Sequence, residues 1–300
     1  FGGIRSGAEC LSNEIGVFNT SFVAGAVPYG TTTVAAVDDS RAEAQFFVLP
    51  EVYSVVPSCG SVGTVVAVAG TGYAANEVIT VAFGINANIQ QALTDENGLF
   101  NTIFTVDTQR FGTCTIIVSG AKAVAGNIFS IQPQVYSVSP TMGTVGTIVC
   151  VAGTGYAADD NIIIAFGTNA GIQQVMADSR GWFEATFTID TQVYDETLVT
   201  ASSTTAMATN TFRILPELYS VMPENGTVGT IVTISGSGYG ANDMITIAFG
   251  TNNTIQQVFA SSNGSFSTTF TVDVQQYGTT TITANGMSSA VNIFFIQPQV

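Results

Sequence analysis

One block of sequence occurs three times in this chain at a constant spacing. It starts as VYSVVPSCGSVGTVV at Val52, as VYSVSPTMGTVGTIV at Val135 and as LYSVMPENGTVGTIV at Leu218. The tyrosines of these blocks stand at positions 53, 136 and 219, which gives a period of 83 residues. A fixed period of this length predicts an array of equivalent structural units instead of one large domain.

The similarity extends through each unit and defines the expected domains. Complete units are predicted at 52–134, 135–217 and 218–300, whereas residues 1–51 match only the later part of a unit, with Phe1 and Gly2 at the positions of Phe83 and Gly84. One interpretation is that the chain is a segment of a longer array, and the place of Val300, where a next first strand would begin, favours it. The other is that a neighbouring molecule supplies the missing strands.

The charge balance excludes several classes of function. The chain has 6 basic and 21 acidic residues, no histidine and a formal net charge of -15. Nucleic acid is not expected as a partner, because phosphate binding needs clustered Lys and Arg. Without histidine there is no Ser-His-Asp or Cys-His pair, and the single lysine, Lys122, has no counterpart in the other units. No enzymatic activity is expected.

Charged residues make up only 9% of the chain and apolar residues 46%. Strands whose outward positions carry Thr and Ser fit this composition, and a surface with few charges loses its hydration at low cost when it meets a neighbour. No run of about 18 apolar residues and no signal peptide occur in the sequence. The composition therefore favours assembly with copies of the same chain.

Alternating apolar residues predict β-strands. Val66 and Val68 share one face of a strand, and Phe100 and Phe104 share one face of another, with equivalent pairs in the later units. The tetrapeptides DENG, DSRG and SSNG between two such strands are predicted hairpin turns. About seven short strands in 83 residues indicate an all-β fold, a tandem array of immunoglobulin-like β-sandwiches. An aromatic residue before the penultimate strand is expected to pack into a corner of each sandwich; these are Tyr29, Phe111, Tyr194 and Tyr277.

A longer motif carries a family resemblance. The string P-x-x-G-x-x-G-T-x-V, followed by G-x-G-Y and F-G, is similar to the IPT/TIG family of immunoglobulin-like repeats and to related repeats of prokaryotic cell-surface fibre, S-layer and adhesin proteins. Its residues in the first complete unit are Pro57, Gly60, Gly63, Gly70, Gly72, Tyr73, Phe83 and Gly84. The resemblance implies the fold and an extracellular or cell-surface location, and little about the function, because such repeats serve as spacers, adhesion modules and assembly units.

The joins between units contain Pro133 or Pro216 and no run of Gly or Ser. Short joins of this kind predict a stiff rod. We therefore expect an extracellular structural protein that packs with copies of itself into a filament, sheath or surface layer. The alternative is the stalk of an adhesin whose binding domain lies outside this segment and recognises a surface glycan or a host protein, with Trp182 as the one exposed aromatic residue that could stack on a sugar.

Four cysteines are candidates for crosslinks. Cys59 in the loop between the first two strands and Cys114 after the corner are predicted at one end of a sandwich, which suggests a disulfide. Cys150 is predicted to point outward. Cys150 and Cys10 are expected either to remain free thiols or to form disulfide bonds with a neighbouring chain. The outward residues Val78, Ile163 and Met244 are predicted to join them in assembly contacts.

Acidic loop residues suggest calcium at the joins. Oxygen ligands for a hard cation could come from one unit's corner and the next unit's loop. The candidates are Asp107 with Asp159 and Asp160, and Asp190 with Asn242 and Asp243. The alternative is that these side chains only cap turns.

Overall fold

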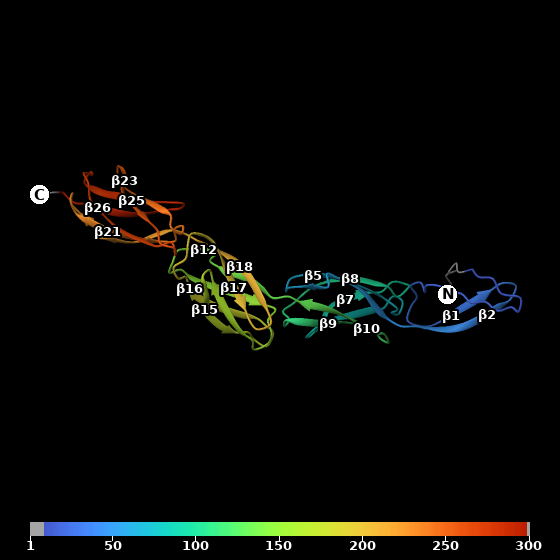
Figure 1. Ribbon diagram of the computed structural model, residues 1–300. Helices are drawn as coiled ribbons and strands as arrows, with labels where there is room; N and C mark the ends of the chain where they lie inside the picture. The colour runs from blue at the N-terminus through green and yellow to red at the C-terminus, as the bar shows by residue number, and fades with distance from the viewer. Residues whose placement is uncertain (1–8, 299–300) are drawn as a thin grey trace. The chain divides into compact units, whose positions relative to one another are not determined.

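The computed structural model describes residues 9–298, and the chain divides into two compact units, one ending at Gln132 and one starting at Pro133. Every regular element within residues 9–298 is a β-strand (Figure 1). No helix that could cross a membrane occurs in this part of the chain. The all-β, immunoglobulin-like fold expected from the alternating pattern is confirmed.

The first complete sandwich lies in the N-terminal unit and has two sheets, in the strand orders β3-β5-β8 and β4-β10-β9-β6-β7. Its strands are β3 (Glu51–Val56), β4 (Cys59–Gly60), β5 (Val65–Thr71), β6 (Val78–Phe83), β7 (Asn86–Leu93), β8 (Phe100–Thr105), β9 (Gly112–Ser119) and β10 (Val124–Ile131). All pairings are antiparallel except that of β4 with β10, which is parallel.

The second unit holds two further sandwiches with the same topology. The first of them is formed by β11 (Gln134–Ser139), β12 (Met142–Gly143), β13 (Ile148–Thr154), β14 (Asn161–Phe166), β15 (Asn169–Met176), β16 (Phe183–Thr188), β17 (Asp195–Ser202) and β18 (Met207–Ile214). The other is formed by β19 (Glu217–Met222), β20 (Asn225–Gly226), β21 (Ile231–Ser237), β22 (Met244–Phe249), β23 (Asn252–Phe259), β24 (Phe266–Thr271), β25 (Gly278–Asn285) and β26 (Ser289–Ile296).

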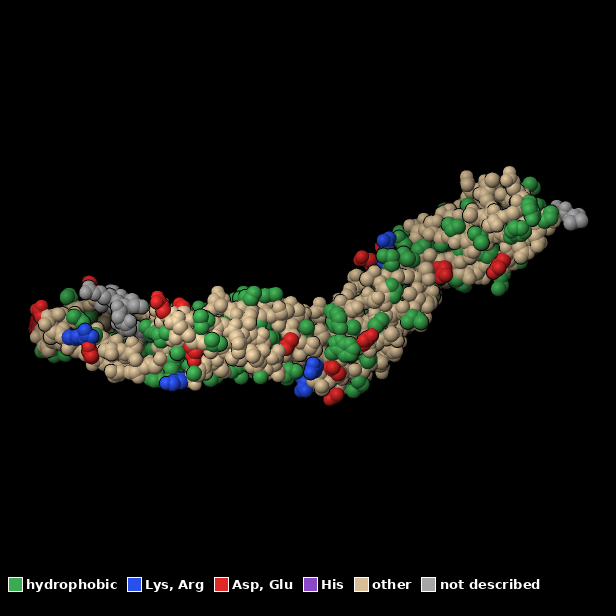
Figure 2. All heavy atoms as spheres, turned by 180° about the vertical axis from the view of Figure 1, so that it is seen from behind, with side chains coloured by type: hydrophobic (Ala, Val, Ile, Leu, Met, Phe, Trp, Pro, Cys, Tyr) green, Lys and Arg blue, Asp and Glu red, His purple; other side chains and the backbone are tan. Residues whose placement is uncertain are grey.

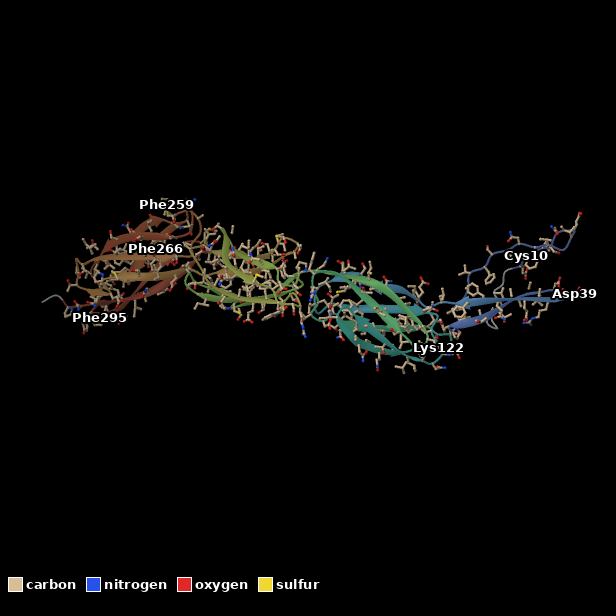
Figure 3. The ribbon with its side chains drawn as sticks, turned by 90° about the horizontal axis from the view of Figure 1, so that it is seen from below. Cys10, Asp39, Lys122, Phe259, Phe266 and Phe295 are labelled. Atoms are coloured by element: carbon tan, nitrogen blue, oxygen red, sulfur yellow. The ribbon has the colours of Figure 1, made fainter. Side chains whose placement is uncertain are left out.

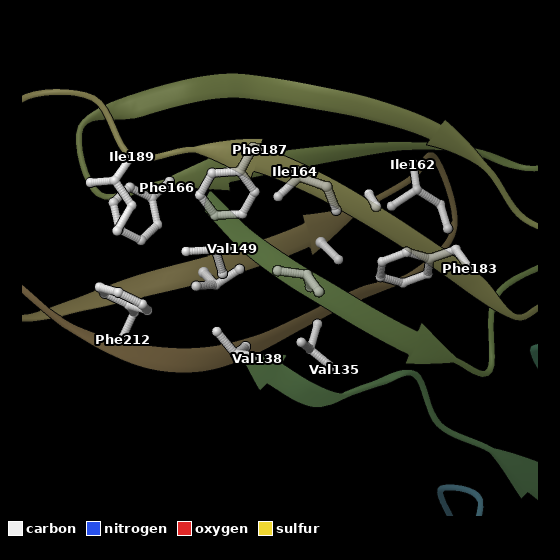
Figure 4. Close-up of a cluster of buried hydrophobic side chains, with 14 of the residues drawn as sticks. Val135, Val138, Val149, Ile162, Ile164, Phe166, Phe183, Phe187, Ile189 and Phe212 are labelled. Carbon is white, nitrogen blue, oxygen red and sulfur yellow. The ribbon is translucent and has the colours of Figure 1, made fainter. Parts of the chain in front are cut away.

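Each sandwich has its own hydrophobic core between the two sheets. In the middle sandwich, the ring centroid of Phe166 lies 5.2 Å from that of Phe187 and 5.6 Å from that of Phe212 (Figure 4). The alternating residues that predicted the strands point into these cores, as the burial of Val66, Val68 and their counterparts shows. Removal of this apolar surface from water is the main stabilising term for each repeat.

The motif I-Q-Q, which occurs in each complete repeat, connects the two sheets along one edge of the sandwich. The side-chain amide of Gln90 on β7 donates a hydrogen bond of 2.8 Å to the carbonyl oxygen of Ile103 on β8, and Gln173 and Gln256 make the same bond in the later repeats. Since β7 belongs to the five-stranded sheet and β8 to the other, this bond joins the two layers at an edge where no ladder connects them.

The DENG, DSRG and SSNG tetrapeptides form turns but not hairpins. The amide of Gly98 donates to the carbonyl of Asp95 at 3.1 Å, as a turn requires. However, β7 pairs with β6 and β8 pairs with β5, so the turn crosses from one sheet to the other. The hairpin prediction was wrong because two consecutive alternating segments do not reveal whether they share a sheet.

Three buried tyrosines from the G-x-G-Y motif line the cores, and they should make stability sensitive to alkali. Burial raises the pKa of Tyr73 to about 12 and also raises the pKa of Tyr156 and Tyr239. A group whose pKa is raised by folding stabilises the protein below its unfolded pKa, about 10 for tyrosine, and loses that contribution as the pH rises. We expect the free energy of unfolding to fall between about pH 10 and pH 12, as urea titrations at stepwise higher pH would measure. Unchanged stability over this range would contradict the burial of these phenols.

The N-terminal part of the first unit is a two-stranded hairpin of β1 (Gly30–Val37) and β2 (Arg41–Val48). The two strands correspond in sequence and order to β9 and β10 of the complete sandwich, and in Figure 1 they form a ribbon of two strands. The alignment of Phe1 and Gly2 with Phe83 and Gly84 lies outside the described residues.

Candidate functional site

The joins between repeats are the most distinctive sites in the structure. In the second unit, the backbone amide of Tyr194, in the corner before β17, donates a 3.0 Å hydrogen bond to the carbonyl oxygen of Tyr239 in the next repeat. In the N-terminal unit, the amide of Tyr29 donates in the same way to Tyr73, at 2.9 Å. In both units, the carbonyl oxygen of the G-x-G-Y tyrosine thus accepts a hydrogen bond from the corner of the preceding repeat.

Glycines make this close approach of backbones possible. A Cβ atom at Gly264 would lie 3.1 Å from the Cα of Val193, and one at Gly98 would lie 3.1 Å from the Cα of Pro28. Both glycines have positive φ, 77° and 72°, which L-residues rarely adopt. The glycine of each crossing turn therefore lies directly against the corner of the preceding repeat.

The second glycine of G-x-G-Y borders the linker. A Cβ at Gly238 would overlap the carbonyl oxygen of Leu215 and lie 3.2 Å from the Cα of Pro216, and Gly72 has the same relation to Leu49 and Pro50. We call Gly238, Tyr239 and Gly264, together with Gly72, Tyr73 and Gly98, the junction sockets. These contacts explain why the G-x-G-Y motif recurs, because both the linker and the corner of one repeat contact the socket of the next.

A polar cluster holds the corner that enters the socket of the second unit. Asp190 accepts hydrogen bonds from the side-chain amides of Asn169 at 2.8 Å and Gln192 at 2.7 Å, and the Gln192 carbonyl oxygen accepts from the amide of Thr168 at 3.2 Å. Gln192 is buried, so these bonds satisfy polar atoms that are out of contact with water. Asp107 and Asp273 centre the same arrangement in the other repeats. Sequence reasoning missed this cluster, although the recurring D-x-Q was visible.

The aromatic residues of the corners do not pack into their own sandwiches as expected. Tyr194 lies at the surface, where its hydroxyl accepts a 3.0 Å hydrogen bond from Arg213, and Tyr277 is mostly exposed beside Phe295. Tyr29 packs against the core of the following repeat. The prediction was wrong because the rings of Tyr194 and Tyr277 lie on the exposed face of the last strand of their own repeats, whereas that of Tyr29 reaches the following repeat.

The residues suggested for calcium are occupied as turn and corner caps. Both carboxylate oxygens of Asp190 accept bonds from its own repeat, and Asp243 accepts the amide of Met287 at 2.6 Å. Asn242 is exposed in a turn with φ of 56°. Within the described part of the chain, no three Asp, Glu, Cys or His side chains lie close enough together to hold a metal ion. A calcium site formed by Asp190, Asn242 and Asp243 stays a prediction, in which the cation would compete with these hydrogen bonds.

The remaining candidates, which were proposed to act across the two units, each have local roles. Asp107 accepts from Asn86 at 2.8 Å and from Gln109 at 2.6 Å. Asp160 accepts from the hydroxyl of Thr205 at 3.2 Å, and Asp159 is an exposed turn residue with φ of 59°.

The predicted disulfide between Cys59 and Cys114 is wrong. Cys59 on β4 pairs with Ser130, and Cys114 on β9 pairs with Phe129, so β10 lies between the two cysteines. Two strand spacings separate their Cα atoms by about 9–10 Å, beyond the roughly 7 Å that a disulfide spans. Both are free thiols, one exposed and one buried. Placing both at the same end of the sandwich was not sufficient, because the strand between them was not foreseen.

The other two cysteines form no disulfide bond with a described cysteine of this chain. Cys10 is exposed on the segment that precedes the hairpin (Figure 3). Cys150 lies on the outer face of β13, half-buried, and its Sγ donates to a carboxylate oxygen of Glu184 at 3.2 Å. This hydrogen bond to Glu184 raises the pKa of the Cys150 thiol, and burial raises that of Cys114.

Thiol labelling should separate the four cysteines into two classes. The thiolate is the reactive form, so raised pKa values slow alkylation. At pH 7.5 we expect iodoacetamide to label the exposed Cys10 and Cys59 at least about tenfold faster than Cys114 and Cys150. The substitution Glu184→Ala should increase the labelling rate of Cys150 and leave that of Cys114 unchanged, as peptide mass mapping would show. Equal rates at all four positions would contradict this assignment.

The outward residues proposed for assembly differ in accessibility. Val78 and Met244, at the starts of β6 and β22, are exposed and stand opposite Leu93 and Phe259. Ile163 is only half-exposed, because it lies within β14 between β15 and β17. Trp182 is also half-buried, and its indole N–H donates to the hydroxyl of Tyr136 at 2.8 Å, forming an aromatic pair on the surface of the middle repeat.

Comparison with known proteins gives no family assignment. No protein-family model and no curated protein matches the chain. Among solved structures, the chain is similar to invasin, a bacterial integrin-binding protein, with 12% identity over 85% of this chain and 61% of that one, and a TM-score of 0.28. It is also similar to the N-terminal eight immunoglobulin domains of the Down syndrome cell adhesion molecule, with 14% identity over 93% of this chain and 41% of that one, and a TM-score of 0.25.

A third similar structure is a Ca²⁺-stabilised adhesin that helps an Antarctic bacterium bind ice, with 14% identity over 88% of this chain and 81% of that one, and a TM-score of 0.22. The chain thus spans less than two thirds of invasin and of the cell adhesion molecule fragment. TM-scores this low carry no argument about this chain, so its fold rests on the strand topology and its function on the sites described above.

Proposed function

We propose that this chain is an extracellular structural protein in which coupled immunoglobulin-like repeats form a spacer that packs side by side with copies of itself into a filament, sheath or surface layer. The observation that carries the proposal is the junction socket, with the hydrogen bond from Tyr194 to Tyr239 and its counterpart from Tyr29 to Tyr73. A socket that fixes the preceding corner limits bending between repeats, which is the property a spacer needs.

Recurring exposed apolar residues support side-by-side packing. Edge strands usually carry charged side chains, prolines or bulges that prevent association. Here Leu93, Met176 and Phe259 end the edge strands β7, β15 and β23, and they are 64%, 58% and 69% exposed. We call these three residues the edge stripe. On the face shown in Figure 2, charged side chains are few and scattered, so a contact there would bury few charges, and salt would screen the repulsion that the net charge of -15 causes between copies.

Self-association of the full chain tests the proposal. Sedimentation velocity and electron microscopy over rising protein concentration should show ordered oligomers that shrink or vanish when the edge stripe is replaced by Asn. The matched control replaces Val65, Ile148 and Ile231, which are equally exposed at one repeated position on the three-stranded sheets, by Thr. Loss of association in the control alone would place the contact on the other sheet. A chain that stays monomeric at every concentration would contradict self-assembly.

A second candidate function is the stalk of a cell-surface adhesin whose binding domain lies outside this segment and recognises a surface glycan or a host protein. The observation that favours it is the aromatic pair of Trp182 and Tyr136, since the equivalent positions of Trp182 in the other repeats hold Leu99 and Ser265. Binding of the full chain to immobilised glycans, lost in the variant Trp182→Ala, would support this function. If the chain is monomeric and binds no glycan, both candidate functions lose their support and only a role as a spacer remains.

A further inference from the structure

The corner before β9 holds a thiol directly beside a side-chain amide. The Sγ atom of Cys114 lies 3.9 Å from Oε1 of Gln109. Both side chains are buried, since Gln109 is 1% and Cys114 is 9% exposed. The two residues are five positions apart in one loop, so a bond between their side chains would close only a short stretch of chain. A nucleophilic atom and a carbonyl group are thus held together away from bulk water.

The glycine of the F-G motif makes room for this contact. Gly84 has φ of 53°, and a Cβ atom there would overlap Oε1 of Gln109 and lie 3.2 Å from Sγ of Cys114. A larger residue at this position would therefore push the amide and the thiol aside, and its backbone would be strained as well. The F-G motif lets the two side chains converge.

Hydrogen bonds fix the Gln109 amide and polarise it. Its oxygen accepts the backbone N–H of Ile85 at 3.2 Å, while its nitrogen donates to the Asp107 carboxylate at 2.6 Å and to the carbonyl oxygen of Phe83 at 3.2 Å. A backbone N–H at the amide oxygen stabilises the negative charge that develops there when a nucleophile adds to the carbonyl carbon. The carboxylate lies within hydrogen-bond reach of the nitrogen that such an addition would expel.

The later repeats contain the same cluster with a hydroxyl group in place of the thiol. A Cβ atom at Gly167 would overlap Oε1 of Gln192 and lie 2.7 Å from Oγ1 of Thr197. The third complete repeat has the same arrangement of Gly250, Gln275 and Thr280. A thiol is intrinsically a much better nucleophile at neutral pH than a threonine hydroxyl. The first complete repeat therefore differs from the other two by one reactive atom in an otherwise equal site.

We propose that Cys114 and Gln109 form an intramolecular thioester after this repeat has folded. Sγ of Cys114 adds to Cδ of Gln109, so that the Sγ–Cδ bond forms and the Cδ–Nε2 bond breaks. The thiol proton passes through the Asp107 carboxylate to the expelled nitrogen, which leaves as ammonia. The reaction consumes no oxidant or reductant, and the product is lighter than the unmodified chain by one ammonia, about 17 Da.

The surroundings of the thiol account for a reaction inside the loop instead of one with solvent. Burial and the negative charge of Asp107 raise the pKa of the Cys114 thiol. The thiol is therefore protonated at neutral pH, and the neighbouring carboxylate has to accept its proton during the attack. A raised pKa slows reaction with a dissolved reagent, but a well-oriented intramolecular partner acts at an effective concentration of about 10⁵ M or more. Burial also keeps water away from the product.

Intact mass and thiol counting on the full chain test this bond. We expect the purified chain to weigh about 17 Da less than its sequence requires. In mildly acidic denaturant, N-ethylmaleimide should label three of the four cysteines. Methylamine converts a thioester into a methylamide and a free thiol, so treatment with methylamine in denaturant should make all four cysteines reactive and place the methylamide on Gln109, as peptide mapping would show.

Three variants provide the controls. Cys114→Thr gives this repeat the side chain of the later repeats and should restore the full mass, whereas Cys59→Ser removes a cysteine outside the cluster and should keep the deficit. Asp107→Asn keeps an oxygen that accepts the Gln109 amide but removes the base, so the bonded fraction should fall at least about tenfold. An unchanged bonded fraction in Asp107→Asn would overturn the role of this carboxylate.

Two results would overturn the bond itself. One is an unmodified chain of full mass in which all four cysteines are labelled without methylamine. The other is a mass deficit that persists in Cys114→Thr, because the ammonia would then have been lost from another residue. The proposed self-assembly rests on the junction sockets and the edge stripe, which contain neither Cys114 nor Gln109, so failure of the bond leaves that proposal untouched.

Discussion

The substitution Phe249→Ala is expected to lower the free energy of unfolding of the third complete repeat by about 3–5 kcal/mol. Phe249 is fully buried, with ring centroids 5.1 Å from Phe270 and 5.6 Å from Phe294. Truncation removes these contacts and leaves a cavity that the two sheets cannot close. Hydrogen exchange of β22 and β25 amides measures the stability of this repeat separately from that of the others. This separation is needed because the chain contains several cores that can unfold independently.

The matched control for this prediction is Phe259→Ala in the same repeat. Phe259 is mostly exposed on the edge strand, whereas Phe266 is buried within the sandwich (Figure 3). Its truncation should change the free energy of unfolding by less than about 0.5 kcal/mol, while it reduces self-association through the edge stripe. Equal losses of stability in the two variants would contradict the assigned core of this repeat.

The substitution Gly238→Ala is expected to uncouple the two repeats of the second unit. Gly238 has φ of 72°, and an added Cβ would overlap the carbonyl oxygen of Leu215 in the linker. The backbone strain costs about 1 kcal/mol, and displacement of the linker adds to this cost. We therefore expect the free energy of unfolding to fall by more than about 2 kcal/mol in total. Exchange of the Tyr194 amide should accelerate at least about tenfold, because the linker and the corner contact the same socket.

A second glycine of the same repeat provides the control. Gly229 also has positive φ, 90°, but a Cβ there would meet no atom within 4 Å. Gly229→Ala should therefore cost only the backbone strain, about 1 kcal/mol, and leave exchange at Tyr194 unchanged. If both variants accelerate exchange at Tyr194 equally, the junction socket does not depend on the close approach at Gly238.

The fold was predictable because the strands that line the cores show their buried face in a period of two and each complete repeat has the same pattern. Val66, Val68, Phe100 and Phe104 are buried as the alternation predicts. The sequence pattern also located the G-x-G-Y motif, although its structural reason emerged only from the contacts of Gly238 and Tyr239 with the preceding repeat.

The errors concern relations across the sandwich, which a pattern along one strand does not contain. The order of strands within a sheet decides that β10 separates Cys59 from Cys114 and that the DENG turn crosses between sheets. Likewise, Asp190 was a plausible calcium ligand until its two amide partners, 21 residues before and 2 residues after it, were known. Side-chain hydrogen bonds over such separations follow from the fold and not from local spacing.

The most direct test of the coupled-repeat account is the rotational diffusion of the second unit, measured by ¹⁵N relaxation in the full chain. Amides of β13 and β21, in the two repeats of this unit, are expected to report one common diffusion tensor, and Gly238→Ala is expected to give each repeat its own tensor. Two independent tensors in the unmodified chain would show that the Tyr194–Tyr239 contact does not hold the repeats together, and would contradict the proposed role as a spacer.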